Sequence, residues 1–179
     1  MNKDLIIKIP LVSHTKDTGN KEWASRSCAI CALKMVMGWK KPGLMDIPVM
    51  KLVKNGLEAG GYLKEVGWKH KVLVDIAGRY GVGMAFIEKF FRTKTQKTKG
   101  LGMINKKLAA GEPVLVSVFY KFNKDNGGHI VVLNGLRKNK NRITGYFIQD
   151  PEPGFRGANY FVSKEEFSDN WRGGLIYLL

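Results

Sequence analysis

Apolar residues recur with the spacing of an α-helix in the first half of the chain. Starting at Cys28, they occupy the i, i+3, i+4 and i+7 positions of one helical face, namely Cys28, Cys31, Ala32, Met35, Val36 and Trp39. This pattern predicts a buried helix that begins at Cys28, where Ser25 and Ser27 supply capping groups. The helix should end near Gly38, because a basic turn with a proline and a glycine follows at residues 40–43.

Three more helices are expected in this half, at residues 45–54, 71–80 and 103–110. Asp46 is the expected cap of the first, and the Asn55–Gly56 pair is expected to end it. The chain before Cys28 is expected to be extended over residues 2–12 and to continue as a polar loop over residues 13–21.

In the second half the apolar spacing changes to the alternation of β-strands. The β-branched and aromatic run at 114–120 predicts a central strand, and 129–136 with 145–149 predicts a hairpin with a basic tip at 139–141. Shorter strands are expected at 160–162 and 175–178, and another at 83–91 with Met84, Phe86 and Phe90 facing inward. Ser163 and Glu166 form a capping-box pattern that predicts a small helix between the last two strands.

Helices followed by an antiparallel sheet indicate the α+β class. With 179 residues, 44% of them hydrophobic, the chain can bury one sizeable core, so we expect a single domain over residues 1–179. Its helical half should span about 13–111 and its sheet half about 112–179. No apolar run approaches the roughly 18 residues of a membrane span, which favours a cytoplasmic protein without a membrane partner.

The net charge is +15, with 30 Lys and Arg residues against 15 Asp and Glu residues. The basic residues concentrate at 92–99 and 137–142, where we expect solvated loops. Such an excess raises affinity for polyanions in general, but no zinc finger, RNA-binding aromatic signature or helix-turn-helix reader is present. A nucleic-acid partner is therefore not favoured, and an acidic substrate fits the charge better.

Cys28 has two interpretations. It can be a core residue of the buried face, or a nucleophile, because the first turn of a helix favours an anion and lowers a thiol pKa. Cys31 is expected in the core. The Cys28–Cys31 spacing could also serve a redox pair or half a zinc site, but His14, His70 and His129 lack the spacing that would complete one. No metal or other cofactor is expected.

A thiol nucleophile needs a base to take its proton, and that base must be oriented by a third group, commonly a carboxylate. Of the three histidines, His129 follows Gly127 and Gly128 at the start of a predicted strand, and Asp150 ends the strand expected to pair with it. The two residues should therefore lie at the same end of the hairpin. His14 and His70 lie in polar, Lys-rich surroundings and are expected to be solvated.

The sequence resembles the bacteriocin-processing cysteine peptidases that cut after a double-glycine leader, and their stand-alone relatives. Blocks similar to that family run in order through the chain, at residues 28–37, 108–118, 128–135, 146–151 and 163–173. The resemblance implies a papain-like fold with the active site between the helical half and the sheet. It also implies Cys28 as nucleophile, His129 as general base and acid, and Asp150 as the residue that orients His129.

One position departs from the family pattern. The family places a glutamine several residues before the cysteine to stabilise the oxyanion, whereas Gln96 and Gln149 are the only glutamines here. His14 and Asn20 are the candidate replacements. Two functions follow: a cysteine peptidase that acts on a peptide or protein through an acyl-enzyme, or a non-catalytic peptide-binding module with a degenerate oxyanion hole.

Overall fold

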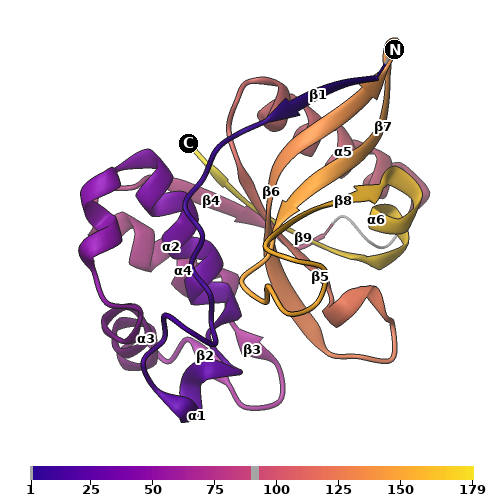
Figure 1. Ribbon diagram of the computed structural model, residues 1–179. Helices are drawn as coiled ribbons and strands as arrows, with labels where there is room; N and C mark the ends of the chain where they lie inside the picture. The colour runs from indigo at the N-terminus through magenta and orange to yellow at the C-terminus, as the bar shows by residue number, and fades with distance from the viewer. Residues whose placement is uncertain (1, 90–92) are drawn as a thin grey trace.

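A computed structural model describes residues 2–89 and 93–179 of the chain, in which the first helices gather on one side of an antiparallel sheet and the last two α-helices lie on the other (Figure 1). The helical part comprises α1 (Lys21–Ala24), α2 (Cys28–Lys40), η1 (Pro42–Asp46), α3 (Val49–Glu58) and α4 (His70–Arg79). A two-stranded hairpin, β2 (Tyr62–Leu63) and β3 (Gly67–Trp68), lies between α3 and α4. The α+β class expected from the sequence is confirmed.

The sheet has seven strands, and its main path runs β4-β9-β5-β6-β7-β8. The bounds of these strands are β4 (Met84–Ile87), β5 (Val114–Phe119), β6 (Gly128–Asn139), β7 (Arg142–Gln149), β8 (Asn159–Ser163) and β9 (Trp171–Leu178). The remaining strand, β1 (Asn2–Ile6), pairs with β6. Two strands, β1 and β4, thus come from outside the expected sheet half.

Helix α2 is the centre of one of two hydrophobic clusters. Its residues Ala29–Gly38 are all buried, Lys34 among them, and α2 packs on α3, α4 and β6. The second cluster lies between the sheet and the helices α5 (Lys94–Ala109) and α6 (Lys164–Asn170), with Ile104, Leu108 and Phe167 at its centre. The seam between the helical part and the sheet is where the first residue of α2 meets the start of β6.

Helix α3 differs from the sequence expectation at both ends. It begins at Val49 with Pro48 as its cap, so the prediction of Asp46 as cap is wrong. It also continues through Asn55 and Gly56 to Glu58. Gly56 is tolerated inside this helix because the Trp68 ring packs directly on it: an added Cβ would lie 2.3 Å from Cζ3. Tertiary packing overrides the local turn signal of the Asn–Gly pair.

Helix α5 is longer than predicted. The basic run at 92–99 was expected to be a loop, but its described residues from Lys94 on are helical. Thr93 and Gln96 form a capping box, and Gly100, Ile104 and Leu108 are buried at a spacing of four. This apolar stripe is narrow and lies among lysines, so the sequence pattern did not reveal the first turns of the helix. Arg92 of this run and Phe90, expected to face inward, lie outside the described residues.

The smaller elements follow the sequence more closely. Ser163 caps α6 by accepting a hydrogen bond from the Glu166 backbone N–H, as its capping-box pattern predicts. The extended start of the chain is a strand only over β1, and the short helix α1 lies in the region after the polar loop. No helix in the described part of the chain is long and apolar enough to cross a membrane.

The contact between Gly56 and Trp68 gives a testable prediction. Gly56→Ala should lower the free energy of unfolding by about 1–3 kcal/mol, because the added methyl displaces the Trp68 ring. Denaturant unfolding measures this difference. Gly78→Ala in α4 is the matched control, since its methyl meets no atom within 4 Å and it should be neutral or stabilising. Equal stability of the two variants would contradict this packing.

Candidate active site

Cys28 is the first residue of α2 and lines a cleft between the helical part and the sheet. Ser27 occupies the cap position before it, but its hydroxyl is hydrogen-bonded to Thr18 at 2.7 Å and does not cap the helix. Trp68 fixes the same turn by donating from Nε1 to the backbone oxygen of Arg26 at 2.7 Å. The turn therefore holds the thiol at a helix N-terminus where the Ser27 side chain does not compete for the backbone N–H groups.

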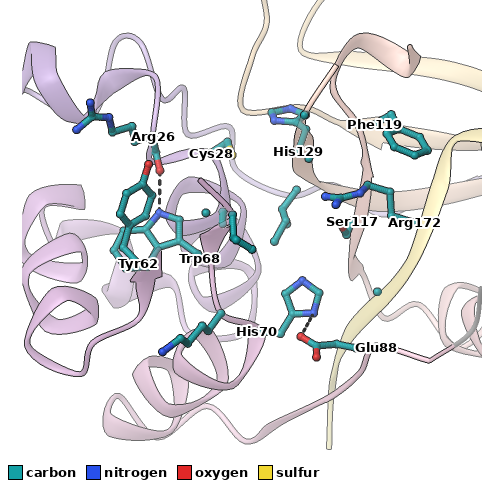
Figure 2. Close-up of a pocket in the computed structure, with 18 of the residues that line it drawn as sticks. Arg26, Cys28, Tyr62, Trp68, His70, Glu88, Ser117, Phe119, His129 and Arg172 are labelled. Atoms are coloured by element: carbon teal, nitrogen blue, oxygen red, sulfur yellow. Dashed lines mark hydrogen bonds and ion pairs between the residues drawn. The ribbon is translucent and has the colours of Figure 1, made fainter. Parts of the chain in front are cut away.

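His129 faces Cys28 from the second residue of β6 (Figure 2). It is buried, with 5% of its surface exposed, and its Nε2 lies 2.7 Å from Oδ1 of Asp150. Because Nε2 is engaged by Asp150, Nδ1 is the nitrogen left for the thiol. The Tyr120 ring makes an edge-to-face contact with the imidazole, with ring centroids 5.4 Å apart and planes at 71°.

Asp150 directly follows β7 and is almost fully buried. Its Oδ1 also accepts a hydrogen bond from the Glu152 backbone N–H at 2.8 Å, and its Oδ2 accepts one from the Tyr160 hydroxyl at 2.8 Å. These donors fix the plane of the carboxylate. A buried carboxylate held in this way can in turn fix the orientation and tautomer of His129.

The electrostatics of Cys28 and His129 are coupled. Burial disfavours the thiolate, but the charge of His129, its hydrogen bond and the backbone N–H groups of Ile130 and Ala29 outweigh it. The pKa of Cys28 is therefore lowered. Burial likewise disfavours the imidazolium, yet the charge of Cys28 and the hydrogen bond that His129 donates to Asp150 raise the pKa of His129 to about 10. The two opposite shifts together favour a thiolate–imidazolium pair.

Cys31 provides the internal contrast. It is fully buried in the α2 cluster, as the sequence predicts, and is close to the hydroxyls of Ser27 and Thr18. Burial raises its pKa to about 12. In residues 2–89 and 93–179, no three His, Cys, Asp or Glu side chains are grouped to hold a metal ion.

The polar groups of the two candidate oxyanion donors are engaged outside the cleft. Neither His14 nor Asn20 lines the cleft. The His14 ring contacts the Ala24 backbone oxygen through Nδ1 and the Glu152 carboxylate through Nε2, the latter at 2.7 Å. The Asn20 side chain caps α1 by accepting from the Trp23 backbone N–H. His14 is buried, so the prediction that it is solvated is wrong.

His70 is a feature of the site that the sequence analysis missed. It was expected to be solvated, but it lines the cleft, and its Nδ1 lies 3.0 Å from Oε1 of Glu88 (Figure 2). Gly174 leaves the room for it, because an added Cβ would lie 2.5 Å from the imidazole Cε1. Burial and the charge of Arg172 lower the pKa of His70, against the opposing charge of Glu88.

The cleft has a volume of about 1000 Å³. One wall carries aromatic side chains of the helical part, with Trp68 and Tyr62 in edge contact at 5.3 Å between centroids. The opposite wall is the end of the sheet, formed by residues of β5, β6 and β9. Cys28 and His129 lie across from each other at the seam, within reach of any chain bound along the cleft (Figure 2).

Comparison with known proteins gives one family and several solved structures. Residues 6–173 match the model of the peptidase C39-like family. A protein described as a C39-like peptidase from Bacillus anthracis is 16% identical, with a TM-score of 0.69 over 99% of this chain and 98% of that one. No protein with a curated description matches the sequence.

Two other solved structures have similar folds. The double-glycine-motif protease from the AMS/PCAT transporter, in complex with its leader peptide, is 18% identical with a TM-score of 0.59, covering 97% of this chain and 93% of that one. The peptidase domain of Streptococcus ComA is 21% identical with a TM-score of 0.60, covering 86% and 91%. At these identities the likeness shows the fold, and the papain-like fold expected from the sequence is confirmed.

The coupled pKa shifts predict a selective thiol reactivity. At about pH 6, iodoacetamide should alkylate Cys28 at least about tenfold faster than Cys31, because a lowered pKa leaves more thiolate at low pH. His129→Ala removes the charge and the hydrogen bond that oppose the effect of burial on the Cys28 pKa, so the alkylation rate of Cys28 at this pH should fall. Peptide mapping by mass spectrometry gives both rates, and urea-unfolded protein should show no difference between them. Equal rates in the folded protein would contradict the ion pair.

The hydrogen bond from Tyr160 to Asp150 gives a second prediction. Tyr160→Phe should lower the free energy of unfolding by about 1.5–3 kcal/mol, the usual range for a hydrogen bond to a charged group. It should also change the pH profile of Cys28 alkylation, because Asp150 is hydrogen-bonded to His129. Tyr146→Phe is the control: it removes a buried hydrogen bond to Asn105 Oδ1 and should leave that profile unchanged. If Tyr160→Phe leaves the pH profile unchanged, the Tyr160 hydroxyl does not influence His129 and the prediction is wrong.

Proposed function

The chain belongs to the peptidase C39-like family, and from this premise we propose that it is a cysteine peptidase in which Cys28, His129 and Asp150 form the catalytic triad. We further propose that residues 1–179 act as one peptidase domain, since the family match spans most of the chain. The observation that carries the proposal is the position of His129, between the Cys28 thiol and the Asp150 carboxylate.

The proposed reaction has two halves. The Cys28 thiolate attacks the carbonyl carbon of the scissile bond, and the His129 imidazolium gives its proton to the leaving nitrogen as the C–N bond breaks. This leaves a thioester on Cys28 and a neutral imidazole. Water then attacks the thioester carbonyl while His129 takes a proton from it, and the C–S bond breaks. The acid is released, and the thiolate–imidazolium pair is restored.

The oxyanion is assigned to the N-terminus of α2. The backbone N–H of Cys28 stands at the first helical position, where it needs no partner within the helix. The positive end of the helix dipole adds to its effect on a developing negative charge. This assignment uses neither His14 nor Asn20, whose polar groups are engaged elsewhere.

A peptide is the proposed substrate. The cleft is open at the seam and large enough for an extended chain, and a fold relative was solved with a leader peptide bound. A non-catalytic peptide-binding module is the second candidate. It is favoured by the absence of His14 and Asn20 from the cleft, because removing one oxyanion donor costs about 100-fold or more in rate.

Trapping of the acyl-enzyme tests the proposal. Peptide thioesters incubated with the protein should add one acyl group to Cys28, detected by intact mass and located by peptide mapping. Hydrolysis of the adduct and release of the acid then show turnover. His129→Ala should slow acylation by about 100-fold or more, because a positioned acid–base group contributes that much.

Cys31→Ala is the matched control, since Cys31 lies on the same helix but in the core. It should keep the acyl adduct, whereas Cys28→Ala should lose it. Peptide binding without any adduct, equally strong in the wild type and in Cys28→Ala, would support the binding module and overturn the peptidase.

A further inference from the structure

We propose that Arg172 selects substrates that carry a carboxylate close to the scissile bond. This inference rests on the proposed peptidase function and names a substrate class for the same cleft. The carboxylate can come from an acidic side chain or from the C-terminus of a peptide, and the two sources are separated by experiment below.

Arg172 lies on β9, which is next to β5 in the sheet, and β5 is next to β6, the strand of His129. It is the second residue of β9, which pairs with β5 through Val118 and Trp171, while Phe119 of β5 pairs with Gly128 of β6. The guanidinium lies over the Phe119 ring, 5.6 Å from its centroid. Its head is directed into the cleft, below His129 (Figure 2).

Gly128 makes room for this arrangement. A Cβ built on Gly128 would lie 1.8 Å from Nη1 of Arg172, so the guanidinium occupies the space that any other side chain would fill. Gly128 immediately precedes His129. The cation thus lies against the residue that precedes the proposed general base and lines the same cleft.

Arg172 has no counter-ion among the described residues. Of the acidic residues in the cleft, Glu88 pairs with His70, and neither Glu65 nor Asp169 forms an ion pair with Arg172. No described side chain or backbone group accepts a hydrogen bond from its guanidinium. A guanidinium is always charged and presents donors in a planar fork that matches a carboxylate.

The surroundings favour an anion at this point. The basic residues that line the cleft outnumber the acidic ones and are Arg26, Lys64, Lys69, Lys71, Lys97 and Arg172. Several of them are engaged: Arg26 pairs with Glu22, Lys71 pairs with Asp75, and Lys69 donates to the Gly60 backbone oxygen. The Arg172 charge reaches His70 across the cleft and helps to lower its pKa. Arg172 is distinguished from Lys64 and Lys97 by its contacts with Gly128, the residue before His129, and with the Phe119 ring.

Matched peptide pairs test the proposal. Fluorogenic peptides from a positional library are compared as Glu and Gln versions at each position from three residues before to three residues after the cleaved bond. Free-acid and amide versions of the C-terminus form the second arm. Wild-type protein should prefer the carboxylate by about tenfold in kcat/KM in one arm, as expected for a charge-assisted hydrogen bond. The arm that shows the preference identifies the source of the carboxylate.

Arg172→Gln should reduce this preference to less than about twofold. Gly128→Ala keeps the charge but displaces the guanidinium, and it should lose most of the preference as well. Gly127→Ala is its control, because an added Cβ there meets no atom within 4 Å. Lys64→Met and Lys97→Met should both keep the preference.

The same peptides also separate failure of this inference from failure of the proposed function. If no peptide is cleaved, affinities for the peptide pairs are measured on Cys28→Ala by fluorescence anisotropy. A carboxylate preference that disappears when Arg172→Gln is added would support the inference without catalysis. Equal affinity or equal kcat/KM for the paired peptides overturns it, as does a preference that survives Arg172→Gln.

Discussion

The geometry of the site depends on the carboxylate of Asp150. It accepts from His129 and from the Glu152 backbone N–H through one oxygen, and from Tyr160 through the other. A buried carboxylate is costly unless its oxygens are satisfied, and here strands β6 and β8 and the turn after β7 each supply a donor. The carboxylate that is hydrogen-bonded to the imidazole therefore also ties these segments together.

The residues that carry the proposed chemistry could be predicted because each has a local signal. Cys28 begins an apolar helical face, His129 follows two glycines at a strand start, and Asp150 precedes a proline. Their meeting at one end of a hairpin follows from strand pairing, and the structure shows the hydrogen bond between His129 and Asp150. Local patterns are sufficient here because each of these residues lies at the start or just past the end of a helix or strand.

The contacts that the sequence did not reveal join residues far apart in the chain. The partner of His14 is Glu152, and that of His70 is Glu88, so neither histidine carries a local sign of its burial. Tyr160 looks like any strand tyrosine until β8 pairs with β7 and brings its hydroxyl to Asp150. Helix α5 was missed for a different reason: its stripe of Gly100, Ile104 and Leu108 is too narrow to stand out among lysines.

The strand order has a consequence for the folding of the chain. Strand β9 lies between β4 and β5, so the sheet stays divided until residues 171–178 have been synthesised. Strand β1 likewise must wait for β6, with Leu5 opposite Leu136. Pairings over such sequence separations form slowly, because the loop must close before the contacts repay its entropy. The nascent chain thus carries the Cys28 thiol for about a hundred residues of synthesis before β6, which brings His129 to it, has been made.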